Sequence, residues 1–441
     1  MYLIGNGKLI PFSDKTPFTD RGAVAVDGEM IIACGEFDAL AEKYPDAELI
    51  DADGGVIMPG FIDLYACSRY TFAGHFKVPR YGRDEGFRLF DSFLWNIERA
   101  LNHEDLIAAA YAFAINSIKH GVTTVFDHHC SPQCAIGSLR SLASVYRECG
   151  LRACLCYEVT DRFGARHAAA SIRENIEFSE FCRDLNIRSL KSMIGIDSAL
   201  TLGDETLKAC IKANSAGIGY HANAALTMDE MYHSIRTRGV RPIMRLENEG
   251  VLSPASLVSG GIAVDHTELE VLKAHDCGLI LTPQLAELTA NAYAQTAEKA
   301  AREQLAGIGS APFSRSVLDA AKRFAEQLLH SGEPAENMYS SAASALFDSN
   351  PRLASKVFAV PIGRLEAGAA ADIIIVRPSV FVPPDAQGCF ILRSSTACEM
   401  TMAAGKVLMR EGRLTGFDES FYLKVFTRAA SELIRRLNEI S

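Results

Sequence analysis

The chain has 441 residues, 48% of them hydrophobic, which suits a large α/β barrel with a smaller appended domain. Its net charge of −10, with no basic block, argues against nucleic acid and anionic membrane surfaces as partners. No apolar run approaches the roughly 18 residues of a membrane span, and the N-terminal residues lack the basic-then-apolar order of a signal peptide. We therefore predict a cytoplasmic protein without nucleic-acid or membrane partners.

Short apolar runs alternate with turns over the first 57 residues, as in antiparallel strands. Residues 23–26 lead into Asp27-Gly28, a strong hairpin signal, and another apolar run follows at 30–34. Similar runs return at 371–376 and 404–409. We predict that residues 1–57 and 351–415 form one composite β-sandwich domain, followed by a C-terminal helix over residues 416–441.

Between these ends, strand-like apolar runs alternate with segments of helical period. Runs at 123–127, 153–159 and 218–222 are separated by helical stretches such as 172–182 and 204–214. Repeated β-then-α units indicate a parallel sheet, and this many of them favour an eightfold barrel. We predict an α/β protein with a distorted (β/α)₈ TIM barrel over residues 58–350.

Twelve cysteines are scattered along the chain, and without a secretory signal they are interpreted as buried thiols rather than disulfides. Cys154 and Cys156 form one close pair, and Cys130 and Cys134 another. Neither pair has a partner at zinc-site spacing, so core packing is the favoured interpretation over a structural metal.

Several motifs carry a family resemblance. They are Met58–Asp63 (MPGFID), Gly121–His129 (GVTTVFDHH), Arg152–Val159 (RACLCYEV) and Ile362–Asp372 (IGRLEAGAAAD). With these motifs the chain resembles the metal-dependent amidohydrolases over nearly its whole length. Within that family it is most similar to the chlorohydrolase/aminohydrolase branch, and there to the aminohydrolases linked to selenium metabolism.

The resemblance implies one divalent metal at the C-terminal mouth of the barrel. The family's usual ligands are two His on strand 1, one on strand 5, one on strand 6 and an Asp on strand 8, with a proton-moving Glu three residues after the strand-5 His. Neutral imidazoles and a carboxylate hold the ion, which makes a bound water nucleophilic near neutral pH.

This chain departs from that pattern at most of the ligand positions. The five positions are filled by Tyr65, Cys67, His221, Gly260 and Ser310. Ala224 stands where the resemblance places the proton-moving Glu. Because only His221 is retained, we expect no cofactor, with a single divalent metal (zinc or iron) as the alternative.

Other side chains remain candidates for chemistry. Tyr65 and Cys67 share one face of a strand, so Cys67 is either a nucleophile activated by His221 or a small filler. A thiolate–imidazole–phenolate metal site from Cys67, His221 and Tyr65 is a further option.

His128 and His129 are adjacent at the end of strand 2, so only one of them points into the barrel. That one contacts substrate or makes a structural hydrogen bond. Tyr65, Asp197 and Asn223 are our candidates for ligand binding.

The sequence supports three functional hypotheses. The first is a catalytically inactive or metal-independent relative that keeps a ligand-binding or assembly role. The alternative is a hydrolase acting on C–N bonds of a cyclic or purine-like substrate with a rebuilt site. The third is a structural subunit beside an active enzyme. For partners we predict a small-molecule ligand and self-association, for example as a dimer.

Overall fold

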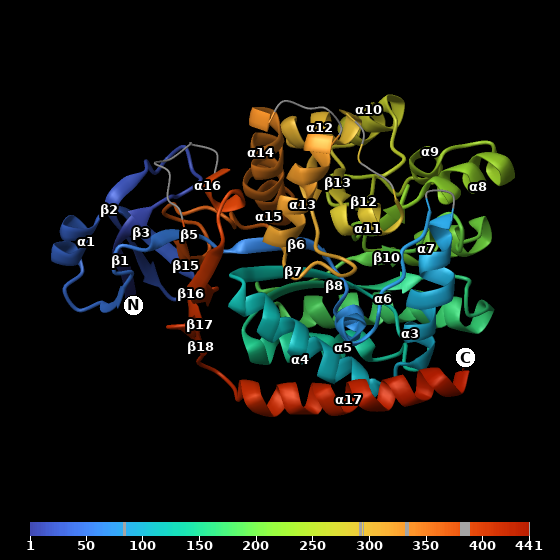
Figure 1. Ribbon diagram of the computed structural model, residues 1–441, viewed down its shortest axis with the longest axis horizontal. Helices are drawn as coiled ribbons and strands as arrows, with labels where there is room; N and C mark the ends of the chain where they lie inside the picture. Colours follow the sequence, from blue (N-terminus) through green and yellow to red (C-terminus); the bar gives the residue numbers. More distant parts are fainter. Residues whose placement is uncertain (83–84, 291–292, 294, 331–334, 380–388, 441) are drawn as a thin grey trace.

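The computed structural model describes residues 1–440 apart from 83–84, 291–292, 294, 331–334 and 380–388. Figure 1 shows a β-sheet domain on the left and a larger α/β barrel on the right, with the C-terminal helix lying along the barrel. This arrangement confirms the predicted fold class, a (β/α)₈ barrel with an extra β-sheet domain.

The appended sheet is assembled from both ends of the chain. Its strands are β1 (Tyr2–Leu9), β2 (Thr19–Asp27), β3 (Met30–Glu36), β4 (Glu48–Asp51), β5 (Val56–Pro59), β15 (Ile373–Pro378), β16 (Thr396–Ala403), β17 (Lys406–Arg410) and β18 (Arg413–Leu414). Strand β5 lies between β1, to which it is parallel, and β15, to which it is antiparallel. The division of the chain at residues 57, 350 and 415 stays a prediction.

The barrel strands are parallel to their neighbours and follow the chain order. They are β6 (Phe61–Ala66), β7 (Val122–His129), β8 (Arg152–Val159), β10 (Ile194–Ile196), β11 (Tyr220–Ala224), β12 (Leu257–Gly260), β13 (Gly278–Leu281) and β14 (Ala306–Ile308), while β9 (Leu190–Ser192) pairs with β8 beside this path. Every residue of β7 and β8 is buried, as expected for parallel strands that are covered on both faces.

The barrel seam lies between its first and last strands, β6 and β14. The side-chain amide of Asn350 bridges them, since it donates to the carbonyl oxygens of Ile62 (2.7 Å) and Ile308 (3.0 Å) and accepts from the Ile308 amide (2.8 Å). The backbone of Ala311 also donates to the Tyr65 carbonyl oxygen at 2.9 Å. These bonds close the barrel between β6 and β14, two described strands that are not joined by a β-ladder.

Helices and helical turns connect and cover the strands. They are α1 (Phe37–Lys43), η1 (Ser68–His75), α2 (Phe87–Leu89), η3 (Phe90–Leu94), α3 (Trp95–Ala100), α4 (His103–Lys119), α5 (Ser138–Cys149), α6 (Ala165–Leu185), α7 (Asp204–Ala213), α8 (Met228–Arg238), α9 (Pro242–Asn248), α10 (His266–Ala274), α11 (Pro283–Leu288), α12 (Gln295–Arg302), α13 (Val317–His330), α14 (Ala335–Ser344), η4 (Ala345–Ser349), α15 (Asn350–Phe358), α16 (Cys389–Leu392) and α17 (Glu419–Ile440). Helix α4 starts at a reciprocal capping box made by Asn102 and Asp105, which satisfies two backbone donors at its N-terminus.

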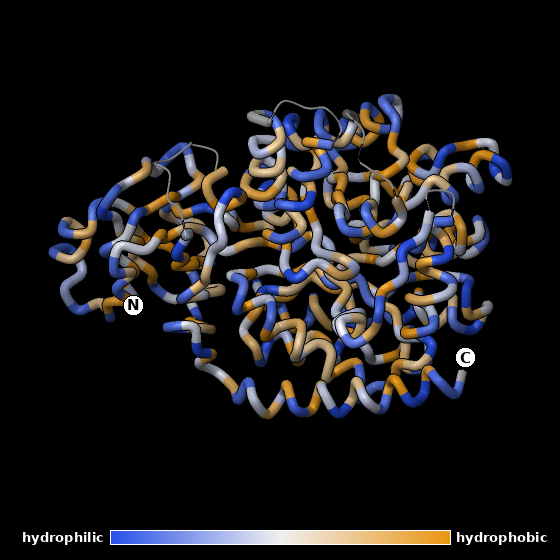
Figure 2. Tube along the Cα trace, viewed as in Figure 1, coloured by the Kyte–Doolittle hydropathy of each residue, from blue (hydrophilic) through white to orange (hydrophobic). Residues whose placement is uncertain are grey.

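The last helix, α17, packs on the outside of the barrel. Its Tyr422 ring stacks on Tyr111 of α4 with the centroids 3.8 Å apart, and Phe426 stacks on Phe72 at 4.8 Å. Figure 2 shows apolar and polar residues alternating along it, as an amphipathic surface helix requires. Over the described residues, no helix has the length and apolar character needed to span a membrane.

Candidate active site

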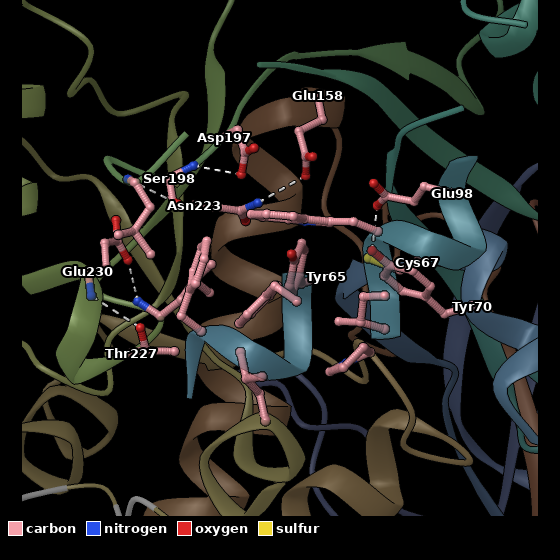
Figure 3. A pocket seen from close by; sticks show the side chains of 18 of the residues that line it. Tyr65, Cys67, Tyr70, Glu98, Glu158, Asp197, Ser198, Asn223, Thr227 and Glu230 are labelled. Atoms are coloured by element: carbon pink, nitrogen blue, oxygen red, sulfur yellow. Dashed lines mark hydrogen bonds between the residues drawn. The ribbon is translucent and has the colours of Figure 1, made fainter. Parts of the chain in front are cut away.

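A cavity opens near the C-terminal ends of the barrel strands, where sites form in this fold. It is lined by the strand ends and the segments that follow them, together with η1, α2, η3 and α3 (Figure 3). The space between the lining atoms, including the open solvent at its mouth, is about 560 Å³. The polar and ionisable side chains that line it include Tyr65, Cys67, Arg69, Glu98, Glu158, Asp197, Asn223 and Glu230.

A buried network of two arginines and three carboxylates forms one wall. Arg162 contacts Glu98 (Nη1–Oε2 2.7 Å), Asp197 (Nε–Oδ2 3.0 Å) and Glu158. Arg69 pairs with Glu98 (Nε–Oε1 2.9 Å), and its Nη2 lies 3.6 Å from Glu158 Oε2. Such pairs are favourable only with complete hydrogen bonding, and here they fix the carboxylates in place.

The network drives the pKa values of two neighbouring carboxyl groups apart. Burial alone would raise the pKa of Glu98, but Arg162 and Arg69 hold it down to about 2. Burial and the nearby charge of Asp197 instead raise the pKa of Glu158 to about 8. Environments that separate two titratable groups in this way are common at functional sites.

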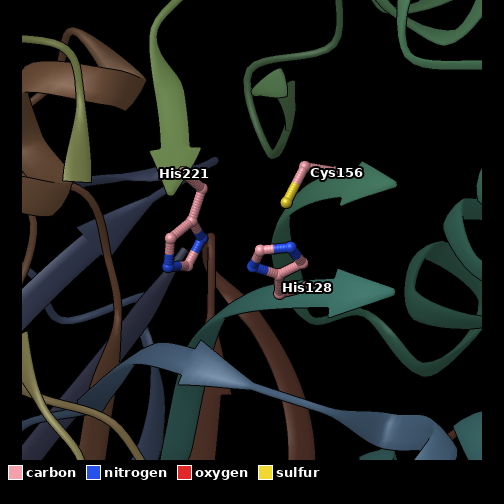
Figure 4. A group of neighbouring side chains, drawn as sticks. All are labelled: His128, Cys156 and His221. Carbon is pink, nitrogen blue, oxygen red and sulfur yellow. The ribbon is translucent and has the colours of Figure 1, made fainter. Parts of the chain in front are cut away.

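Below the cavity, the barrel interior holds a group of three ligand-type side chains. His128 from β7, Cys156 from β8 and His221 from β11 place their donor atoms within 4.8 Å of one another (Figure 4). The two imidazole centroids are 5.0 Å apart. We call these three residues the His–Cys–His group.

The environment of the His–Cys–His group suits a metal ion. Both ring nitrogens of His128 are buried without a hydrogen-bond partner, which is costly unless a ligand satisfies them. His221 Nε2 is held 2.6 Å from Ser259 Oγ, the kind of outer contact that orients metal-binding imidazoles. Burial lowers the pKa of His221 to about 3, so its ring is neutral. Two neutral imidazoles and one thiol fit zinc or a similar divalent ion.

A second group, Glu98, Cys130 and Glu158, also has metal-type spacing. Arg162 donates to both of its carboxylates and lies 3.8 Å from Cys130 Sγ. A guanidinium therefore supplies the positive charge there, and we assign no ion to this group.

The two strand-1 candidates take different places. The Tyr65 ring lies edge-on to His128 (5.7 Å) and His221 (5.3 Å), between the His–Cys–His group and the cavity. Cys67 lines the cavity and is not one of the three residues of that group. Burial raises the pKa of its thiol to about 12, so a thiolate nucleophile is disfavoured near neutral pH.

Strand alternation separates the two adjacent histidines. His128 points into the barrel, whereas His129 contacts Ser131 (Nε2–Oγ 2.9 Å) and packs edge-on against Tyr157 at 5.7 Å. Of the ligand-binding candidates, Asp197 and Asn223 both line the cavity, and Asn223 Nδ2 donates to Glu158 Oε2 at 3.3 Å.

Gly260 and Ser310, which stand at the family's ligand positions on strands 6 and 8, have structural roles in this protein. Gly260 has a φ of +127°, and a Cβ there would lie 2.5 Å from the Ala224 carbonyl oxygen. The backbone therefore excludes a side chain at this position. The Ser310 hydroxyl and its backbone amide both donate to Asp63, so Ser310 joins β6 to the segment after β14.

The buried Asp63 should make folding stability depend on pH. Burial raises its pKa to about 7, although hydrogen bonds from Ser310 and Tyr65 oppose the shift. The folded state thus favours the protonated carboxyl, and this stabilisation, on the order of 4 kcal/mol, is complete below about pH 4 and is lost progressively as the pH rises to and through about 7. Asp63→Asn should flatten the decline of the free energy of unfolding between pH 5 and 8, as measured by urea unfolding at each pH.

The exposed Asp20 provides a matched control for this measurement. Asp20→Asn should leave the decline unchanged. If the free energy of unfolding fell equally with pH in wild type and Asp63→Asn, a group other than Asp63 would be responsible for the decline.

Sequence reasoning missed several residues of this site. Cys156 was assigned to core packing, and Glu158, Arg69 and Arg162 were not singled out. One signal was available, because Cys156 and Glu158 are two residues apart on one strand and share its face.

Comparison with known proteins identifies the family. Residues 56–408 match the model of the amidohydrolase family, and residues 22–47 match the bacterial imidazolonepropionase-like composite domain. A 5-methylthioadenosine/S-adenosylhomocysteine deaminase of Pelotomaculum thermopropionicum is 25% identical, covering 95% of this chain and 94% of that protein. A 5'-deoxyadenosine deaminase of Methanobrevibacter smithii is 24% identical, covering 94% of each.

Solved structures share the fold. An adenosine deaminase from Xanthomonas campestris with bound zinc has a TM-score of 0.84 at 16% identity, covering 98% of both chains. The atrazine chlorohydrolase of Arthrobacter aurescens complexed with zinc has a TM-score of 0.80 at 16% identity, covering 98% of this chain and all of that one.

These findings correct two of our sequence predictions. The prediction of an inactive relative with a degenerate metal site is wrong. Relatives that align over nearly the whole chain are named as deaminases, and the barrel holds the His–Cys–His group. The prediction that there is no cofactor is also wrong. The structural neighbours carry zinc, and ligand-type residues are present here on β7, β8 and β11. Self-association, a partner enzyme and the selenium-linked subgroup stay predictions. The match over most of the barrel and the shared fold establish that the chain belongs to the amidohydrolase family.

Proposed function

We propose that the protein is a hydrolase that removes an amino group from a cyclic, purine-like substrate. The observation that carries the proposal is the His–Cys–His group, with both His128 nitrogens unpartnered, directly below a cavity that Glu158 lines. The deaminases that align over nearly the whole chain support the same reaction class.

His128, Cys156 and His221 are the residues that would hold one divalent metal. The metal would supply a water made nucleophilic near neutral pH. In the net reaction a C–O bond forms, a C–N bond breaks, and the leaving nitrogen gains protons to depart as ammonia.

Glu158 is placed to move a proton in this reaction. Its Oε2 lies 3.7 Å from His128 Nε2 on one side and accepts from Asn223 Nδ2 at 3.3 Å on the cavity side. A carboxylate between the nucleophile and the substrate can take a proton from the water and return it to the leaving nitrogen. Glu158 therefore fills the role that Ala224 cannot.

The remaining residues bind the substrate and exclude water. Trp95, Phe87 and Phe90 supply flat apolar surface to the cavity, and Asp197 and Asn223 supply acceptors. Tyr65 lines the cavity and contacts both imidazoles edge-on, so its ring helps to hold their orientation beside the substrate.

The proposal is tested by measuring ammonia release from aminopurines, their nucleosides and aminopyrimidines, with protein loaded with Zn²⁺ or Fe²⁺. We expect at least one substrate to turn over, and Glu158→Gln to reduce the rate at least about 100-fold. Glu177→Gln, on the outer face of α6, should retain the wild-type rate. No ammonia from any substrate, or an unaffected Glu158→Gln, would contradict the proposal.

A further inference from the structure

The charges around the cavity leave no place for an anionic substrate. Two guanidiniums, Arg69 and Arg162, are both paired with the carboxyl groups of Glu98, Glu158 and Asp197, and Glu230 adds a fourth carboxyl group to the lining. Neither guanidinium is left over to pair with a further anion. Any anion entering the cavity would therefore meet carboxylates without a surplus of positive charge to compensate them.

The arginine donors are directed away from the ligand space. Arg69 donates to Glu98 and to the His128 carbonyl oxygen, and Arg162 donates to Glu98, Asp197 and Glu158. These guanidiniums build the wall and do not form the open fork that binds a phosphate or carboxylate.

One acceptor in the wall has no partner. The Asn223 side chain is 4% exposed and lines the cavity, and its Oδ1 is buried without a hydrogen bond. Its Nδ2 is held by Glu158 Oε2 at 3.3 Å (Figure 3), so the amide presents its oxygen rather than its nitrogen. A buried acceptor of this kind requires a donor from the ligand.

Aromatic side chains in the lining favour a flat ring. Trp95 and Phe87 both line the cavity; the Arg162 guanidinium lies 4.5 Å from the Trp95 ring centroid, and Phe87 packs edge-on against Trp95 at 5.1 Å. A planar heterocycle can place one face on these rings while its N–H edge meets Asn223.

We propose, building on the function proposed above, that the cavity selects neutral or cationic planar heterocycles that donate an N–H group to Asn223 Oδ1 and rejects substrates bearing phosphate or carboxylate. The acceptor wall supplies the selection, because an analogue without the donor leaves Asn223 unpaired.

Binding to metal-free protein, measured by calorimetry, tests this selection without turnover. The probes are matched sets: adenosine, purine riboside and adenosine 5'-phosphate; 2-aminopurine riboside, purine riboside and 2-aminopurine riboside 5'-phosphate. In at least one set, the amino-bearing nucleoside should bind at least about 10-fold more tightly than both counterparts. If no set shows this order, the proposal is overturned.

Asn223→Leu should weaken the preferred nucleoside at least about 10-fold while its amino-free counterpart changes little. Asn337→Leu, on the outer helix α14, is the control and should bind as wild type does; unfolding midpoints confirm that both variants fold. Equal binding by wild type and Asn223→Leu would overturn the assignment to this residue. If the affinities follow the expected ranking but no ammonia is released, the proposed function alone is rejected. If nucleoside and nucleotide release ammonia at equal rates, the proposed selection alone is rejected.

Discussion

Replacing His128 by alanine should abolish tight binding of one divalent ion and lower any ammonia release at least about 100-fold. The reason is that His128 contributes one of three donors that lie within 4.8 Å of one another, and both of its nitrogens lack a hydrogen-bond partner. Metal content by mass spectrometry and activity after reconstitution provide the two measurements.

The thiol of the group gives an independent spectroscopic test. Protein loaded with Co²⁺ should show a thiolate-to-cobalt charge-transfer band, which Cys156→Ser should lose. Cys149→Ser is the matched control, because that buried thiol lies on α5 outside the barrel. A full equivalent of metal in His128→Ala, or a band that survives in Cys156→Ser, would place the ion elsewhere.

Arg162→Ala should destabilise the fold by about 3–5 kcal/mol, because it leaves buried carboxylates without their partner. The guanidinium contacts Glu98, Asp197 and Glu158, and all four side chains are almost completely buried. Equilibrium unfolding in urea measures the loss. Arg162→Lys should restore only part of it, since an ammonium cannot reproduce the three directed contacts.

Arg173→Ala provides the exposed counterpart, because Arg173 pairs with Glu177 on the surface of α6. That substitution should leave the unfolding midpoint unchanged. A loss below about 1 kcal/mol for Arg162→Ala would mean that water or neighbouring groups replace its contacts.

The fold could be predicted because its signals are local. The apolar run at 153–159 identifies a strand from its own residues, and the order of such runs specifies the barrel. The motif at 58–63 spans the end of β5 and the start of β6, so it does not show where one strand ends and the next begins. The apolar runs at both ends of the chain predicted a shared sheet domain, but which strands pair, such as β5 with β15, was known only from the structure.

The site was harder to predict because its parts meet only in three dimensions. Family positions directed attention to Tyr65, Cys67 and Gly260, whereas the ligand-type residues lie on β7, β8 and β11. Which of His128 and His129 faces inward depends on the pleat of β7, and Cys156 looks like an ordinary core thiol until His128 and His221 are placed beside it. The sequence therefore identified His128 and His221 separately but not their association with Cys156.

The sheet shared by both chain ends also sets an order of events during synthesis. Strand β5 is made early and ends one residue before barrel strand β6, yet its neighbour β15 is made only after all the barrel strands. Until then one edge of β5 lacks its partner, and an unpaired edge can recruit foreign strands. A ribosome that stalls before residue 373 would thus release a chain whose barrel strands are complete but whose sheet domain has an open, adhesive edge.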